Sequence, residues 1–282
     1  MTEIQYYDRP VLFYVLATLI TWVAWFAAAA FSHMEPPQQG HEIITGVLML
    51  LGLASPTLIA FTMMYRNPHL RRDLLPRLLS VSGVKPHMML LACGLMPASL
   101  LLAQVLSLFM GHDLNQFRLA EKPSFNFPLF PAWVMLFLAP LVEELAWHSY
   151  GTDCLRARFN LLTTSIMFAL FWVVWHFPLS FIKDYYHSNV VATHWIYGVN
   201  FALSLFPFVI LMNWLYYRSN RNILVAVVFH ISAGFFNELF ATHPDSKVIQ
   251  TLLLMILTGV ILYRERPLFL KRDFAQNEAP KG

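Results

Sequence analysis

The chain has 282 residues, of which 57% are hydrophobic and only 12% are charged, with a formal net charge of +3. Soluble domains carry about 25% charged residues, so this composition excludes an ordinary soluble protein and indicates a polytopic membrane protein folded as a single domain. The small positive charge is no sign of nucleic-acid binding, because the basic residues stand in loops and in the C-terminal tail.

Eight apolar runs predict transmembrane helices, most of them close to the roughly 20 residues that cross the hydrocarbon. The first is not preceded by the basic segment of a signal peptide, so we expect it to be retained. The predicted fold class is therefore an all-α bundle of about eight transmembrane helices. In chain order the predicted spans are Val11–Phe31, Ile44–Tyr65, Met88–Met110, Pro128–Trp147, Leu162–Ile182, Trp195–Tyr217, Ile223–Ala241 and Val248–Tyr263.

The distribution of basic residues predicts the orientation. With eight spans and a cytosolic N-terminus, 15 of the 19 Lys and Arg residues fall on the inner side, as the positive-inside rule requires. Both termini are then cytosolic, and residues 273–282 form a tail that we expect to be disordered. The short loops and tails suit a protein of the bacterial inner membrane.

The segment Arg66–Lys85 combines leucines with Arg71, Arg72 and Arg77. The spacing of its leucines predicts an amphipathic helix on the inner membrane surface, with its arginines toward anionic headgroups. The alternative is a basic loop that only sets the topology.

Polar residues interrupt three of the apolar runs. Glu143 and Glu144 follow the apolar segment 133–142, and a charge at that depth costs at least about 2.5–3.5 kcal/mol. His176 and His230 interrupt the fifth and seventh runs, and Glu238 is the other acid within a predicted span. The acid pair and the two imidazoles are the candidate functional residues.

These residues also have a structural interpretation. Consecutive helical residues point about 100° apart, so Glu143 and Glu144 cannot form a face-to-face carboxylate dyad. His148 stands four residues after Glu144, on the same face, and could form an ion pair that fixes helix packing. A buried histidine such as His176 or His230 can simply donate to a neighbouring helix. Their coincidence with the acid pair favours a functional site.

Three short motifs, in this order, resemble those of the CPBP family of intramembrane proteases, whose best-known branch is the type 2 CAAX prenyl protease. The family pattern has a Glu-Glu pair with Arg four residues after the second Glu, then Phe or Trp four residues before a His, then a His with Asn four residues later. The segment 51–56 also resembles an early family signature. The three motifs of this chain, which fall within residues 140–240, are Glu143-Glu144-Leu-Ala-Trp147-His148, Trp172-Val-Val-Trp175-His176 and His230-Ile-Ser-Ala-Gly234.

Two positions depart from the family pattern. His148 stands where the family usually has Arg, and it can still pair with Glu144, although the charge of a histidine depends on pH. Gly234 stands where the family usually has Asn, and it has no side chain to donate a hydrogen bond. Asn237, seven residues after His230 and nearly on the same face, is a candidate replacement.

The resemblance implies an intramembrane endopeptidase that hydrolyses a peptide bond. Glu143, with His176, would activate a water, His230 would stabilise the oxyanion, and Glu144 completes the set of site residues. We expect a membrane-associated protein or peptide as substrate, a site open toward the cytosol and no cofactor. Neither the identity of the substrate nor the oligomeric state is indicated.

Three other functions fit some of the same residues. Glu143, His176 and His230 could be zinc ligands, since two imidazoles and a carboxylate leave a coordination position for water. The departures at His148 and Gly234 would suit a catalytically degenerate protein that acts as a bacteriocin-immunity or regulatory binding factor. A small transporter with a proton-relay glutamate is the third alternative, although polar residues are scarce in the first, second, third and eighth predicted helices.

The predicted boundaries place Glu143 and His176 at different depths in the membrane. They place Glu143 within about two turns of the cytosolic end of its span, whereas His176 lies about fourteen residues, or roughly 20 Å, into the next. A later start of the fifth helix, a longer fourth helix or a strong tilt would bring the two residues together.

Overall fold

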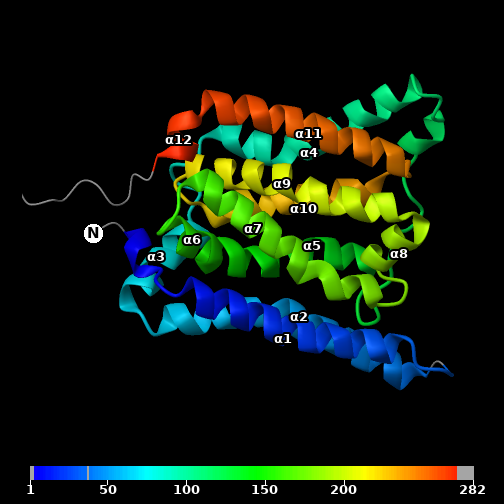
Figure 1. Ribbon diagram of the computed structural model, residues 1–282, viewed down its shortest axis with the longest axis horizontal. Coiled ribbons are helices and arrows are strands. Elements are labelled where there is room, and N and C mark those ends of the chain that lie inside the picture. The colour runs from blue at the N-terminus through cyan, green and yellow to red at the C-terminus, as the bar shows by residue number, and fades with distance from the viewer. Residues whose placement is uncertain (1–2, 37, 272–282) are drawn as a thin grey trace, which may run out of the picture.

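The computed structural model describes residues 3–36 and 38–271, so the predicted tail at 273–282 lies outside the described residues. Long helices run side by side as one bundle (Figure 1). Within the described residues the only β-type pairing is an isolated antiparallel bridge between Leu119 and Phe240. The predicted all-α fold class is confirmed.

The helices vary widely in length. The longer ones are α1 (Pro10–Ser32), α2 (Gln39–Tyr65), α4 (Pro86–Leu108), α5 (Ala132–Ala146), α7 (Leu161–His176), α9 (Trp195–Arg218), α10 (Ile223–Leu239) and α11 (Pro244–Arg264). The shorter elements are η1 (Glu3–Tyr6), α3 (Pro68–Leu79), η2 (Leu114–Phe117), η3 (Trp147–Gly151), α6 (Thr152–Arg156), η4 (Phe177–Phe181), α8 (Tyr186–Thr193) and α12 (Arg266–Leu270).

Six of these helical segments are long and apolar enough to cross a membrane, namely α1, α2, α4, α7 together with η4, α9 and α11. Their outer faces expose large apolar side chains such as Val23, Leu58 and Leu90, which a lipid environment would cover. The two other predicted spans correspond to α5 and to α10, which has 17 residues. The chain is therefore an integral, multi-pass membrane protein.

The fourth span was predicted too short. After α5 the helix continues through η3, a π-helical turn, and α6 without a break as far as Arg156. Glu143 thus lies 13 residues, or about 20 Å, from that end of the helix, and His176 lies 15 residues, or about 22 Å, from the start of α7. The longer helix removes the conflict of depth between the two residues.

The segment 51–56 lies within α2 and packs against α1. A Cβ atom at Gly52 would lie 2.2 Å from Nε1 of Trp25, so only glycine admits the indole at this point. The Trp25 indole donates to the carbonyl of Met49 (3.0 Å), and the Thr21 hydroxyl donates to the carbonyl of Gly52 (3.0 Å). The part of the chain that resembled an early family signature therefore packs two helices together.

The predicted amphipathic helix forms as α3, within the segment 66–85. Arg71 and Arg72 are exposed, as expected for arginines that face headgroups. Arg77 is instead buried, with only 6% of its surface exposed. The prediction that all three arginines point toward the membrane surface was therefore wrong for Arg77, because buried carboxylates compete for its guanidinium.

Arg77 belongs to a buried ionic cluster. It pairs with Asp73 at 2.5 Å and with Asp153 at 3.0 Å, and Arg221 pairs with the same two carboxylates at 2.8 and 2.6 Å. Two positive and two negative side chains balance one another, as buried charges require. The cluster ties α3 and α6 to the loop between α9 and α10.

The start of the chain and α12 lie at the same end of the bundle as α3 and α6, whereas α8 lies at the opposite end (Figure 1). The guanidinium of Arg156, at the end of α6, donates to the carbonyl of Lys271, just after α12 (3.2 Å). The two ends of the described chain are thus on one side, as predicted. That this side is the cytosolic one stays a prediction.

Candidate active site

The candidate site residues come together from three helices. Glu143 on α5, His176 on α7 and His230 on α10 line a single cavity of about 330 Å³. Glu144 points away from this cavity and is fully buried, as the 100° step between neighbouring residues predicts. The two acids therefore occupy different environments.

Glu143 reaches the cavity with its carboxylate held by two tryptophans. Its Oε2 atom accepts from the indole Nε1 of Trp172 (3.2 Å) and from that of Trp147 (3.4 Å). No Lys, Arg or His makes a salt bridge to it among the described residues. A carboxylate that is held by neutral donors keeps lone pairs available for a water in the cavity.

Trp172 stands at the centre of the site. Its ring centroid lies 5.5 Å from that of His176 and 5.3 Å from that of His230, while its indole nitrogen donates to Glu143. One side chain thus contacts all three cavity-lining candidates. These contacts restrain the distances between Glu143, His176 and His230, because the buried indole of Trp172 is large and tightly packed.

The two histidines have fixed ring orientations. Nδ1 of His176 lies 2.8 Å from the carbonyl oxygen of Trp172, and Nδ1 of His230 lies 2.7 Å from Oε1 of Glu144. Both partners are acceptors, so both Nδ1 atoms carry hydrogens. The Nε2 atom of each ring is the one left for chemistry in the cavity.

Glu144 is shared by two imidazoles. His148 contacts its Oε2 atom through Nδ1, one helical turn along, and His230 contacts its Oε1 atom from α10. His148 and Glu144 are both fully buried. The acid therefore orients the cavity-lining His230, and the expected pairing of Glu144 with His148 is present in the structure.

The ring of His148 is held by hydrogen-bond partners on both sides. The Ser165 hydroxyl donates its one hydrogen to the carbonyl of Leu161, so it accepts from the amide Nδ2 of Asn213 (2.9 Å). The amide oxygen of Asn213 then faces Nε2 of His148 at 3.0 Å. Both ring nitrogens of His148 thus face oxygen atoms, one of Glu144 and one of Asn213.

The backbone carbonyl oxygen of His148, which lies in the π-helical turn, accepts hydrogen bonds from two other helices. It accepts from the Arg77 guanidinium and from the Tyr216 hydroxyl. Tyr216 is in turn 3.0 Å from a carboxylate oxygen of Asp153. Turns of this kind are rare and frequently occur at functional sites, and here the turn places His148 between the acid pair and the ionic cluster.

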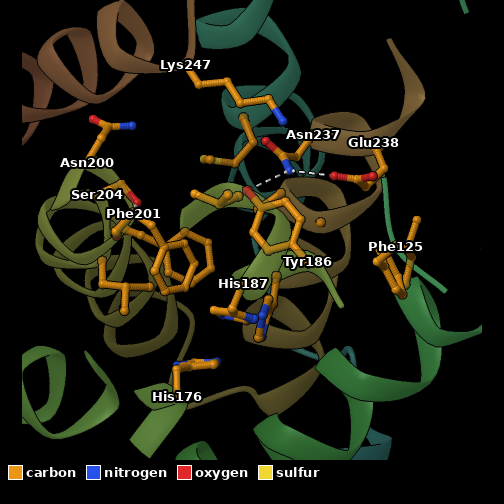
Figure 2. A pocket seen from close by; sticks show the side chains of 18 of the residues that line it. Phe125, His176, Tyr186, His187, Asn200, Phe201, Ser204, Asn237, Glu238 and Lys247 are labelled. Atoms are coloured by element: carbon orange, nitrogen blue, oxygen red, sulfur yellow. Dashed lines mark hydrogen bonds between the residues drawn. The ribbon is translucent and has the colours of Figure 1, made fainter. Parts of the chain in front are cut away.

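The position of the missing asparagine is open space. Gly234 lines the cavity, and a Cβ atom built on it would have a single neighbour within 4 Å, the Cδ2 atom of Leu136 at 3.9 Å. Asn237 also lines the cavity, but its amide nitrogen donates to the Tyr186 hydroxyl (3.3 Å) and to Glu238 (3.0 Å). Figure 2 shows Asn237 in the upper part of the view, near Tyr186, and His176 at the bottom.

A further histidine, His187 on α8, lies against the site. Its ring stacks on that of His176 with a centroid distance of 5.1 Å, and the ring of Phe201 packs edge-on against it at 4.7 Å. Neither ring nitrogen has a hydrogen-bond partner among the described residues. Figure 2 shows His187 between His176 and Tyr186. His187 therefore lines the cavity while both of its ring nitrogens are buried.

The cavity extends away from the end that holds the chain termini. Its lining continues from Glu143 to the exposed Thr193 at the end of α8 and to Tyr197 and Lys247 in the first turns of α9 and α11. Those turns lie at the opposite end of the bundle (Figure 1). The expectations of cytosolic termini and of a cytosol-facing site are therefore incompatible, because the cavity and the termini are at opposite ends.

Several residues that shape the site were missed from the sequence. Trp172 was not among the candidate site residues, but its indole nitrogen hydrogen-bonds to Glu143. Its place four residues before His176, where the resembled pattern has Phe or Trp, was the available signal. Asn213 was visible as a lone amide in an apolar run, whereas Arg77 and His187 gave no signal, because their contacts depend on helix packing.

The spacing of possible metal ligands bears on the zinc alternative. Among the described residues, His112, His243 and Asp245 form a group whose ligand atoms all lie within 4.8 Å of one another. Glu143, His176 and His230 do not form such a group. Since zinc–ligand bonds of about 2.0–2.2 Å place ligand atoms close together, a zinc ion at the candidate site would require side-chain movement.

Comparison with known proteins agrees with the three motifs. A model of the type II CAAX prenyl endopeptidase Rce1-like family matches residues 125–236. The chain is also 31% identical, over 270 residues, to CAAX prenyl protease 2 of Methanococcus maripaludis, an alignment that covers 95% of this chain and 98% of that relative. With this similarity along almost its whole length, the chain belongs to the type II CAAX prenyl endopeptidase family.

Proposed function

We propose that the protein is an intramembrane endopeptidase in which Glu143 and His176 activate a water molecule. The observation that carries this proposal is the convergence of Glu143, His176 and His230 from three helices on one cavity. Membership of a protease family supports the same conclusion. The carboxylate and the Nε2 atom of His176 are the two acceptors that can take a proton from water.

The proposed reaction is direct attack by water on a peptide carbonyl. Glu143 accepts one proton of the water while the oxygen of the water bonds to the carbonyl carbon. The tetrahedral intermediate then collapses, the C–N bond breaks, and Glu143 passes the proton to the leaving amine, so that a carboxyl group and a free amine are released. In its doubly protonated form His230 would donate from Nε2 to the oxyanion, while Glu144 holds its Nδ1. A donor of this kind contributes about 2.7–4 kcal/mol to lowering the barrier.

We propose that this chemistry requires no metal ion. The separation of the candidate ligands supports this proposal, since Glu143, His176 and His230 do not form a compact ligand group. Cleavage by protein freed of metal with a chelator would agree with it. Loss of cleavage that returns with zinc, and that does not depend on His112, would favour the zinc alternative.

The substrate class that we propose is a membrane-associated peptide with a lipidated C-terminal CAAX sequence. The name of the archaeal relative supports this choice. The lining of the cavity is also suited to it, because Phe125, Met135 and Phe208 offer apolar contacts beside the polar cluster. We expect the protein to act in the cell membrane, because its short loops and tails suit a bacterial inner-membrane protein.

Full-length protein in liposomes, supplied with a farnesylated CAAX peptide, provides the test. Release of the C-terminal tripeptide is measured by mass spectrometry for the wild type and for Glu143→Gln. We expect the substitution to reduce the rate at least a hundredfold, because it removes the acceptor for the proton of water. Glu42→Gln, which changes an exposed glutamate of α2, is the matched control and should retain the wild-type rate.

A comparison of new peptide N-termini in host membranes extends the test to unknown substrates. Termini that appear with the wild type and vanish with Glu143→Gln, at equal protein levels, would name the substrates. Identical profiles, together with rescue of a deletion phenotype by the variant, would overturn the proposal. The open space at Gly234, where the family usually has a side chain, would then favour the immunity or regulatory binding role.

A further inference from the structure

We propose that His112, His243 and Asp245 form a binding site for a divalent transition-metal ion of the zinc class, separate from the candidate active site. His112 follows α4, His243 immediately precedes α11, and Asp245 lies in the first turn of α11. None of the three lines the active-site cavity. The proposal does not depend on the proposed protease function.

The ligand atoms have the spacing that such an ion requires. The Oδ2 atom of Asp245 lies 3.3 Å from Nε2 of His112 and 3.6 Å from Nδ1 of His243. In a tetrahedral site with bonds of about 2.0–2.1 Å, neighbouring ligand atoms are about 3.3–3.4 Å apart. One ligand atom from each residue lies within 4.8 Å of the others, so small side-chain movements would complete the site.

The carboxylate is already oriented for binding. The Tyr197 hydroxyl donates to the Oδ1 atom of Asp245 at 2.9 Å, which leaves Oδ2 facing the two imidazoles. Hydrogen bonds of this kind position a ligand and are a regular feature of metal sites. The rings of His112 and His243 are in contact, with centroids 4.2 Å apart, so two imidazoles and one carboxylate already converge.

The chemistry of the donors selects the class of metal. Two imidazole nitrogens and one carboxylate oxygen suit zinc and neighbouring first-row ions, whereas calcium and magnesium prefer oxygen ligands. The side chains of His243 and Asp245 are 46% and 45% exposed, so a water can supply the fourth ligand. Nδ1 of His243 now accepts from the backbone N–H of Asp245 (3.2 Å), and a metal bond would replace this hydrogen bond.

The site would fasten the loop after α4 to one segment of the cavity wall, the start of α11. It connects the loop after α4 to the turn between α10 and α11, and Pro244 and Lys247 in that turn region line the cavity. A bound ion would therefore stabilise this end of the bundle without contacting the reacting atoms. Because the ligands do not exist as a group in the unfolded chain, binding adds to the stability of the folded protein.

The test uses the purified full-length protein after treatment with a chelator. Zn²⁺ binding is followed by titration calorimetry and by the melting temperature, and Co²⁺ binding by the intensity of its visible absorption. We expect one ion per chain, a melting temperature that rises with Zn²⁺, and affinity at least tenfold weaker in both His112→Ala and Asp245→Asn. Comparison of the metal-free variants with the metal-free wild type separates binding from folding.

Two controls make the result specific. His87→Ala changes an exposed histidine elsewhere, and Glu143→Gln changes the candidate active site, so both should keep the wild-type affinity. An affinity that is unchanged in His112→Ala and Asp245→Asn, or a wild type that binds no ion at micromolar concentration, would overturn the proposal. Loss of the ion in Glu143→Gln would move it to the candidate active site and would equally overturn the separate site.

Discussion

Arg77 donates a hydrogen bond from its guanidinium to the backbone carbonyl of His148. This contact joins α3, which is not one of the six long apolar spans, directly to the π-helical turn that follows the acid pair. The same guanidinium pairs with Asp73 and Asp153. The position of His148, and through it that of Glu144, thus depends on an ionic cluster at the end of the bundle.

Arg77→Lys should destabilise the protein and slow cleavage together. A single ammonium group cannot serve two carboxylates and a carbonyl with the geometry of a guanidinium, and impairing a buried ion pair costs up to about 3–5 kcal/mol. We expect a lower melting temperature in detergent and a reduced rate with a CAAX peptide. Arg72→Lys, on the exposed face of α3, should leave both unchanged, and equal behaviour of the two variants would contradict the role of Arg77.

Stability should fall at acidic pH through Asp73. Burial alone would raise the pKa of this carboxyl, but the positive charges of Arg77 and Arg221 outweigh it and lower the pKa below its usual value. A depressed folded-state pKa stabilises the protein at pH values above the unfolded pKa, about 3.9. That contribution is lost as the pH falls through the folded value.

The measurement is the melting temperature between pH 3 and pH 7. We expect a decline for the wild type below about pH 4, where the unfolded carboxyl begins to bind protons. Asp73→Asn should be less stable than the wild type at neutral pH and should show a shallower decline. Parallel curves for the two proteins would show that Asp73 does not contribute.

Gly234→Asn should accelerate cleavage without loss of stability. The cavity has room for the side chain, since only Leu136 approaches a Cβ atom at this position, and an added amide could donate to the oxyanion. One such donor is worth about a hundredfold in rate. Gly234→Leu fills the same space without a donor and should slow cleavage, so a similar effect of both substitutions on kcat would refute this account of the missing asparagine.

Trp172→Phe should lower kcat/KM by about tenfold. The substitution keeps an aromatic ring near His176 and His230 but removes the donor to Glu143, and hydrogen bonds to charged groups contribute about 1.5–3 kcal/mol. The weaker donor from Trp147, at 3.4 Å, remains, which limits the loss. Trp175→Phe is the matched control, because its indole nitrogen has no partner among the described residues.

Thiol labelling should establish which membrane face the cavity opens onto. Thr193 is exposed at the far end of the cavity, and Ser82 is exposed in the loop after α3, near the chain termini. In a Cys93→Ser background, with Cys154 buried, each is replaced by cysteine. If the termini are cytosolic, an impermeant maleimide labels Thr193→Cys in intact cells and Ser82→Cys only after permeabilisation. The reverse pattern would show a cytosolic cavity and would contradict the positive-inside prediction.

The sequence predicted the fold class and the convergence of Glu143, His176 and His230, because the cost of burying polar groups in an apolar run is a local property. The boundary of the fourth span was predicted too early, at Trp147, because the polar residues His148 to Asp153 read as a loop. They are buried instead by partners from α3 and α9. Such compensation comes from segments distant in the chain and is invisible to a local pattern.

The same reason explains the error at Arg77. Its spacing on α3 does not distinguish it from Arg71 and Arg72, which are exposed. Arg77 is buried because it pairs with Asp153, which also pairs with Arg221, and both partners are distant from α3 in the sequence. The role of Asn237 as a replacement for the missing asparagine stays a prediction, and its hydrogen bonds to Tyr186 and Glu238 compete with that role.

The contact between His148 and Asn213 also has an evolutionary consequence. The amide oxygen of Asn213 lies 3.0 Å from the second ring nitrogen of the histidine, a contact that arises only because an imidazole occupies position 148. A longer guanidinium at this position would extend into the space beside α9 and would need a different neighbour. Residues 148 and 213 should therefore vary together among relatives, with an amide at 213 accompanying histidine, and other side chains there accompanying arginine.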